Sequence, residues 1–211
     1  MRTVIYVVRH GESEANRDEI ISGHFDTPLT DEGRKQAAQT AIKLKDIHFD
    51  GAYSSDLQRA IETAEIIYGK SLDTANHIEQ LRERTFGSLE GKPSERLRKL
   101  FEDQKDHRNS LSEQDRWEHQ VAEDIESDHM LSNRFTEALE QIAQDNPGKT
   151  ILVAAHGGGI RTMLIKLKHG TPAELPSGSF RNAGHVKLVY DGKELLVDEV
   201  DGVELQKRSA E

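Results

Sequence analysis

The sequence predicts an α/β fold, a three-layer α/β/α sandwich around a mostly parallel sheet with an antiparallel edge strand. Two observations indicate it: strands alternate with helices, and the strands have the apolar character of strands buried on both faces. Short apolar, β-branched runs alternate with stretches of helical spacing. Two of these runs, at 4–8 and 150–155, also end in a histidine followed by a glycine. Continuous apolar runs are typical of strands buried on both faces, as in parallel sheets, which bind ligands at the carboxyl ends of their strands.

The N-terminal part of the chain is expected to form two βα units. The strand at 4–8 runs into the turn Arg9-His10-Gly11, where Gly11 is expected to let the backbone approach a ligand and to open a helix. The following elements are a helix from Thr30 to about 46, a strand at 51–55, and a helix that Asp56 caps and Gly69 ends. A weaker segment at 72–81 is expected to contain a further strand.

The C-terminal part repeats this arrangement and adds a hairpin. The strand at 150–155 precedes His156-Gly157-Gly158-Gly159 and a helix with apolar positions from Ile160 to Leu167. Runs at 186–190 and 195–200 flank Asp191-Gly192, a strong signal for a β-hairpin. The hairpin predicts the antiparallel pairing at one edge of the sheet.

A charged stretch between the two parts has no strand pattern. We therefore expect a single domain over 1–211 with a helical insertion at about 93–133, placed over the active site. The alternative is a disordered spacer without a role, which the composition also allows.

Composition limits the classes of function. A net charge of −10 argues against nucleic acid or an anionic membrane as partner, and no apolar run approaches the length of a membrane span. The absence of cysteine suits a reducing compartment, so a cytoplasmic location is expected. A small anionic substrate would need a local basic pocket, which makes the position of each arginine informative.

Phosphoryl transfer fits the residues at the predicted strand ends. The reaction needs an in-line nucleophile, donors for the phosphoryl oxygens and a proton source for the leaving oxygen. His10 is the candidate nucleophile, because a neutral imidazole can attack phosphorus and form a phosphohistidine. Neighbouring guanidinium groups should lower its pKa and keep it neutral near pH 7.

Other residues supply the remaining parts. Arg9 and Arg59 would clamp the phosphoryl oxygens through paired charge-assisted hydrogen bonds, and His156 with the Gly157 N–H would donate to the same group. Glu83 is the candidate general acid, because a bound phosphate dianion would favour its protonated form. Taken singly, each of these residues also has a purely structural interpretation. A histidine can be a buried residue whose hydrogen bonds are satisfied, and an Arg-Glu-Arg run can be a solvent-exposed face of ion pairs.

Metal and nucleotide sites explain these residues less well. The sequence contains no His-Glu-x-x-His motif, cysteine pair or aspartate cluster, and neither a Walker-type phosphate loop nor a dinucleotide fingerprint. We therefore expect no metal and no cofactor.

Five motifs, in order along the chain, resemble those of the histidine phosphatase superfamily, the phosphoglycerate mutase-like group. They are Arg9-His10-Gly11-Glu12-Ser13 with Asn16, Ser22-Gly23 with 26–33, Ser54-Ser55-Asp56-Leu57-Gln58-Arg59-Ala60, the segment 81–91 around Glu83, and Ala155-His156-Gly157-Gly158. The resemblance implies that His10 is phosphorylated, that Arg9, Arg59 and His156 hold the phosphate, and that Glu83 is the acid. It also implies that Asn16, Ser22 and Gly23 line the pocket and that no metal is required.

Within the family, we expect a phosphomonoesterase acting on a small phosphorylated metabolite rather than a phosphoglycerate mutase. The glycolytic mutase usually has tryptophan where this chain has Ala15, a longer chain, and paired arginines in the insertion, whereas Arg108 and Arg116 are scattered here. A third alternative is a non-catalytic regulator that binds a phosphorylated ligand, although His10 and Glu83 are both present. The substrate, the movement of the insertion and the oligomeric state stay open.

Overall fold

The computed structural model describes residues 1–203, and residues 204–211 of the expected domain lie outside the described part. Its sheet has the strand order β2-β3-β1-β4-β5. β1 (Thr3–Arg9), β2 (Gly51–Ser54) and β3 (Thr150–Ala155) pair in parallel, while β4 (Phe180–Tyr190) is antiparallel to both β1 and β5 (Leu195–Val203). The β4–β5 hairpin therefore forms one edge of a mostly parallel sheet, which confirms the expected fold class.

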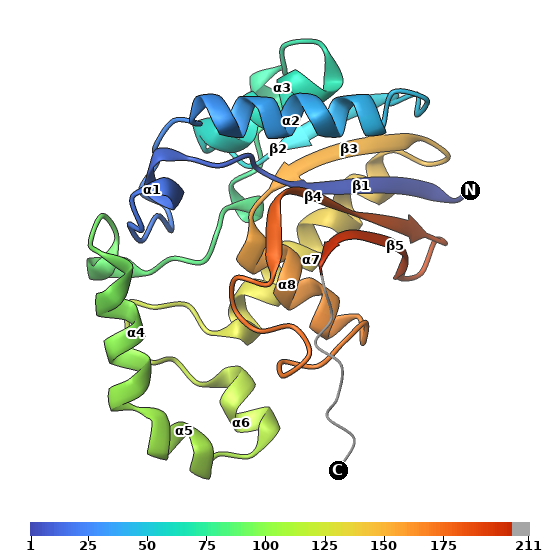
Figure 1. The fold of residues 1–211 in the computed structure, drawn as a ribbon. Coiled ribbons are helices and arrows are strands. Elements are labelled where there is room, and N and C mark those ends of the chain that lie inside the picture. The colour runs from blue at the N-terminus through green and yellow to red at the C-terminus, as the bar shows by residue number, and fades with distance from the viewer. Residues whose placement is uncertain (204–211) are drawn as a thin grey trace.

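Helices cover both faces of this sheet (Figure 1). α2 (Asp31–Lys43) and α3 (Gln58–Tyr68) lie on one face, and α7 (Asp128–Asp145) and α8 (Gly157–Lys166) on the other. The alternation of β1 explains the arrangement, because Ile5 and Val7 enter the core under α7 and α8, whereas Tyr6 and Val8 enter the core on the opposite face. Burial on both faces accounts for the continuous apolar run in the sequence.

The charged central stretch forms short helices outside the main layers. They are α4 (Ser94–Asp103), α5 (Lys105–Ser110) and α6 (Glu113–Glu118), and they lie at the end of the molecule toward which β1 runs (Figure 1). The next helix, α7, has Leu131 and Phe135 fully buried. Residues from Asp128 onward therefore belong to a core helix, although the expected insertion extended to about 133.

The expectation of a strand at 72–81 is wrong. This segment instead holds the 3-10 helices η1 (Thr74–Asn76) and η2 (Glu79–Leu81), with a single bridge between Ser54 and His77. The Asp73 side chain accepts a hydrogen bond from the Ala75 backbone N–H, which turns the chain out of an extended path. Only the Ile78 N–H continues a strand-like bond, to the Ser54 carbonyl at 2.8 Å.

Two expected helix starts also differ. Asp56 does not cap α3, whose N-cap is Leu57 without a side-chain bond, because the Asp56 carboxylate pairs with Arg82. Gly11 does not begin a helix, because α1 (Glu14–Arg17) starts later, capped by Ser13. The remaining short element is η3 (Gly87–Leu89). None of the helices within residues 1–203 has the length and apolar character to cross a bilayer.

Candidate active site

His10 is the first residue after β1, and its ring is held in one tautomer. Its Nδ1 lies 2.6 Å from the Gly11 carbonyl oxygen. A carbonyl can only accept, so Nδ1 carries the proton and the Nε2 lone pair is left available. Burial lowers the pKa of His10 well below 6.5, and the nearby charges of Arg59 and Arg9 lower it further. The ring is therefore neutral at pH 7.

His156 lies at the end of β3, the strand next to β1. The ring centroids of His10 and His156 are 5.1 Å apart, with an edge-on orientation. Burial, followed by the charge of Arg59, lowers the pKa of His156 well below its usual value. Its Nε2 shares a hydrogen bond with the Ser55 hydroxyl at 2.6 Å. The two parallel strands thus bring two neutral imidazoles together, as the positions of the His-Gly turns predicted.

Arg59 is buried and Arg9 is partly buried beside these rings. Arg59 is fully buried near the start of α3, where Nη1 donates to the Asp26 carboxylate at 2.9 Å and Nη2 donates to the Gly23 carbonyl at 2.7 Å. Arg9 donates to the Phe180 carbonyl on β4. Burial lowers the pKa of both arginines below its usual value, while the charge of Glu83 acts to raise it. Both guanidinium groups stay charged at pH 7.

Three buried nitrogen atoms of these side chains have no hydrogen-bond partner in the described part of the chain. They are Arg9 Nε, Arg59 Nε and His156 Nδ1. Buried polar groups are normally satisfied, so a cluster of such atoms on neighbouring cationic and imidazole side chains suits an anionic ligand.

Glu83 is fixed beside the start of α8. Its Oε2 accepts from the Gly158 backbone N–H at 2.9 Å, and its Oε1 accepts from the Arg84 N–H at 2.7 Å. Since Gly158 lies two residues after His156, the carboxyl group of Glu83 is close to the His156 strand end. A Cβ at Gly158 would overlap Glu83 Oε1, so only glycine leaves room for the carboxylate there.

The flanking arginines point elsewhere. The Arg82 side chain forms a bidentate ion pair with Asp56, and the Arg84 side chain pairs with Asp128 at the start of α7. The Arg-Glu-Arg run is therefore divided, with only the central carboxylate directed to α8.

The pocket-lining candidates Asn16 and Gly23 contact the same group of residues. Asn182 Nδ2 donates to the His10 carbonyl at 3.1 Å and to Asn16 Oδ1 at 3.3 Å, which connects Asn16 to the end of β1. The Gly23 carbonyl accepts from Arg59, as described above. Gly23 has a φ of +54°, and a Cβ there would overlap the Glu90 carboxylate.

Ser22 and Gly157 are placed through their neighbours. The Ser22 carbonyl accepts from the Phe25 N–H at 2.8 Å, closing the turn that Arg59 contacts. Gly157 begins α8, and a Cβ there would lie 3.1 Å from Arg9 Nε, so this glycine lets the Arg9 side chain pack against the helix start.

Three residues that contact the predicted site residues were not predicted, and only one of them has a signal in the sequence. Ser55 directly follows β2 at the same edge of the sheet, and this position was a usable signal. Asn182 and Arg134 had none, because their contacts with 10 and 80–83 join positions far apart in the chain.

Gly11 has a packing role that the sequence did not predict. A Cβ there would overlap the Gly33 backbone, and a Cβ at Gly33 would overlap the Glu12 backbone. The two glycines therefore let the start of α2 pack against the turn that carries His10. Within residues 1–203, no group of three or more histidine and acidic side chains is placed to hold a metal ion.

Comparison with known proteins gives the same assignment as these motifs. A family model for the histidine phosphatase superfamily (branch 1) matches residues 5–201. The chain is 31% identical over 181 residues to an uncharacterized phosphatase, PhoE, of Bacillus subtilis, covering 86% of this chain and 85% of that protein. It is 32% identical over 181 residues to a 2,3-bisphosphoglycerate-dependent phosphoglycerate mutase of Cytophaga hutchinsonii, covering 82% and 80%. A shorter match is to fructose-2,6-bisphosphatase TIGAR B of Danio rerio, with 48% identity over 99 residues. This match covers 44% of this chain and only 38% of that protein.

Solved structures are similar over nearly the whole chain. YhfR of Bacillus stearothermophilus superposes with a TM-score of 0.78 at 27% identity, covering 96% of this chain and 98% of that one. A mutant phosphoserine phosphatase of Entamoeba histolytica in complex with phosphoserine has a TM-score of 0.77 at 26% identity, covering 94% and 96%.

Proposed function

Because the chain belongs to the histidine phosphatase superfamily (branch 1), we propose that it is a phosphomonoesterase that acts through a phosphohistidine on His10. One observation carries the proposal: His10 is neutral, its proton is on Nδ1, and it lies beside a cluster of buried nitrogen atoms without partners. A nucleophile with a free lone pair and a set of donors for an anion are the two requirements for transfer of a phosphoryl group to the protein.

In the first step, His10 Nε2 attacks phosphorus and the ester P–O bond breaks. Arg9, Arg59 and His156 hold the phosphoryl oxygens, whose charge they stabilise as the bonds change. Glu83 gives its proton to the leaving oxygen, so the product leaves as a neutral alcohol and Glu83 is left as a carboxylate.

In the second step, water replaces the alcohol. The Glu83 carboxylate takes a proton from the water as its oxygen attacks phosphorus, and the P–N bond to His10 breaks. Inorganic phosphate leaves, His10 Nε2 regains its lone pair and Glu83 is protonated again. Asn16, Ser22, Gly23 and the Gly157 N–H line the pocket in this proposal.

The substrate class in this proposal is a small phosphorylated metabolite. It is supported by the relatives whose names include phosphatase and by the fold match to a phosphoserine phosphatase that was solved with phosphoserine. The expectations of a cytoplasmic location and of metal-independent activity remain part of the proposal.

The alternative is a cofactor-dependent phosphoglycerate mutase. The similarity to the Cytophaga hutchinsonii mutase over most of the chain favours it. The difference lies in the phosphoenzyme: a mutase must exclude water while the product reorients, whereas a phosphatase admits it.

Incubation of the wild type and His10→Ala with a panel of phosphorylated metabolites, including 3-phosphoglycerate, tests the proposal. We expect the wild type to release inorganic phosphate and His10→Ala to release none. If 3-phosphoglycerate is converted to 2-phosphoglycerate without release of phosphate, the alternative is correct. If no donor gives either product, the enzyme proposal fails and a ligand-binding role replaces it.

A further inference from the structure

We propose that Arg134, together with Glu126, is a positioning residue that holds the Glu83 carboxyl group in place for proton transfer. This inference rests on the proposed function, because it concerns the acid of that reaction. Neither residue belongs to the motifs on which the family resemblance depends.

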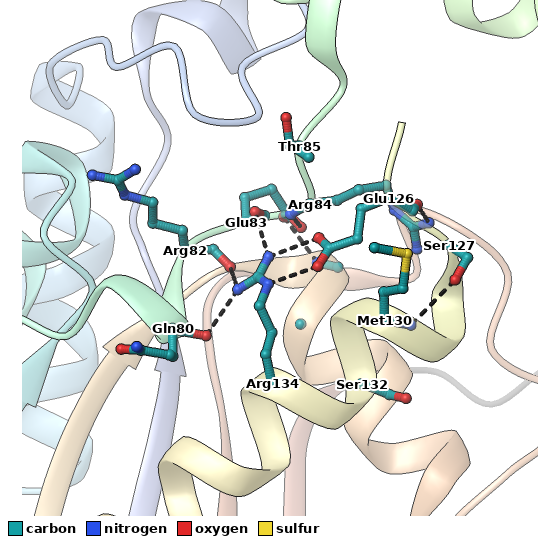
Figure 2. Close-up of polar contacts among 12 residues, drawn as sticks. Gln80, Arg82, Glu83, Arg84, Thr85, Glu126, Ser127, Met130, Ser132 and Arg134 are labelled. Atoms are coloured by element: carbon teal, nitrogen blue, oxygen red, sulfur yellow. Dashed lines mark hydrogen bonds and ion pairs between the residues drawn. The ribbon is translucent and has the colours of Figure 1, made fainter. Parts of the chain in front are cut away.

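The Arg134 guanidinium forms hydrogen bonds with main-chain carbonyls of the segment that carries Glu83 (Figure 2). Nη1 donates to the carbonyls of Gln80 and Arg82, and Nη2 donates to the Glu83 carbonyl, each at 2.8 Å. Its Nε and Nη2 also donate to the two Glu126 carboxylate oxygens, at 2.7 and 2.8 Å. These bonds occupy all five N–H donors of the guanidinium, so its whole donor capacity goes to one loop and one carboxylate.

Glu126 holds the other side of the same segment. Its backbone N–H donates to the Thr85 carbonyl at 3.1 Å, and its carbonyl accepts from the Arg84 side chain. Arg84 also pairs with Asp128, at the start of α7. Residues 80–85 are therefore connected at both ends to α7 and to the loop that precedes it.

The buried apolar face of α7 fixes the position of the helix that carries Arg134. Phe135, next to Arg134, and Leu139 are fully buried in the core cluster that the sheet and α8 share, and Leu131 is fully buried as well. The Glu126 side chain is only 7% exposed, so loss of Arg134 would leave a buried charge, and the carbonyls of Gln80 and Arg82 would lose their donor. The Glu83 carbonyl would keep only its hydrogen bond with His24 Nε2 at 3.0 Å.

The main-chain position of Glu83 determines where its carboxyl group lies. The carboxyl oxygens accept from the N–H groups of Arg84 and Gly158, which belong to two different elements. A loop released from Arg134 can move away from Gly158, because the carboxyl group then follows its own backbone. Misplacement by about 1 Å is enough to cost on the order of 100-fold in a catalysed step.

The dependence of the reaction rate on the leaving group distinguishes a positioning role of Arg134 from a general role in stability. Phenolate is a more basic leaving group than p-nitrophenolate, so its departure depends on the proton from Glu83. The less basic p-nitrophenolate departs readily as an anion. A misplaced acid slows the first reaction and spares the second. A fraction of misfolded protein reduces both rates equally and leaves their ratio unchanged.

The experiment measures kcat/KM for phenyl phosphate and for p-nitrophenyl phosphate with the wild type, Arg134→Ala, Arg134→Lys and Glu126→Gln. For Arg134→Ala we expect a loss of about 10- to 100-fold with phenyl phosphate and below about threefold with p-nitrophenyl phosphate. Arg134→Lys keeps the charge but has three donors, so its loss should be intermediate, and Glu126→Gln should show the same pattern more weakly.

Arg34→Ala is the matched control, because Arg34 is also an ion-paired arginine, with Asp31 and Glu62 as partners, but its hydrogen bonds go to those two residues and not to residues 80–85. It should leave the ratio of the two substrates unchanged. Equal losses on both esters in every Arg134 and Glu126 variant, with an active wild type, would overturn this inference alone. A wild type that hydrolyses neither ester would overturn the proposed function and the inference with it.

Discussion

At the scale of single residues, the site depends on atoms that main-chain groups hold in place. The Gly11 carbonyl fixes the proton of His10 on Nδ1, and the Gly158 N–H fixes one oxygen of Glu83. In the proposed reaction these contacts set the two roles, because one leaves a nucleophilic lone pair on nitrogen and the other places the acid beside the α8 start.

Substitution of Gly158 tests the placement of Glu83. A methyl group in Gly158→Ala overlaps Glu83 Oε1 and displaces the carboxyl group from the helix start. We expect kcat/KM for phenyl phosphate to fall by about tenfold or more, while the free energy of unfolding changes little. Steady-state kinetics and urea denaturation measure the two quantities.

Gly51→Ala is the control, since a Cβ at Gly51 on β2 meets only the Ile151 side chain at 3.4 Å, an ordinary contact. It should retain full activity. Unchanged activity in Gly158→Ala would show that the position of Glu83 seen here does not matter for turnover.

At the scale of the elements, the carboxyl ends of β1 and β3 bring His10 and His156 together because these strands are hydrogen-bonded neighbours, with Arg9 opposite Ala155. The sequence was sufficient to predict this part. Each strand is an unbroken apolar run, and each turn carries its histidine at the same position after the strand. Parallel pairing then determines that the two turns meet.

Other elements could not be predicted from local pattern. The segment 72–81 contains leucine and isoleucine residues but forms 3-10 turns, because a side-chain cap from Asp73 outweighs a weak strand propensity. The partners of Arg82, Arg84 and Arg134 come from distant parts of the chain. The sequence of a charged segment such as 82–84 does not show which of its side chains faces the site. It also does not show which distant residues hold that side chain in place.

At the scale of the whole molecule, burial of neutral histidines makes stability depend on pH. The pKa values of His10 and His156 are depressed in the folded chain, so below pH 6.5 the unfolded chain binds protons that the folded chain does not. The unfolded state is then favoured as the pH falls, and the stability is fully present only above this range.

We therefore expect the free energy of unfolding to fall as the pH decreases from about 6.5 to 5, by up to roughly 1 kcal/mol per pH unit for each of these histidines. His10→Gln and His156→Gln should each reduce the slope by roughly that amount. Urea denaturation across this range measures it. His48→Gln, which removes an exposed histidine, is the control for the substitution itself. Equal slopes in all four proteins would contradict the buried neutral state of the two rings.

In the proposed reaction His10 carries the phosphoryl group, and trapping of the phosphoenzyme is the direct test of this step. The wild type is mixed with radiolabelled p-nitrophenyl phosphate, quenched within the first turnover and digested, and the labelled peptide is identified by mass spectrometry. We predict an acid-labile, base-stable label on His10 in the wild type and none in His10→Ala. Turnover by the wild type without label on His10, or full turnover by His10→Ala, would show that His10 is not the nucleophile.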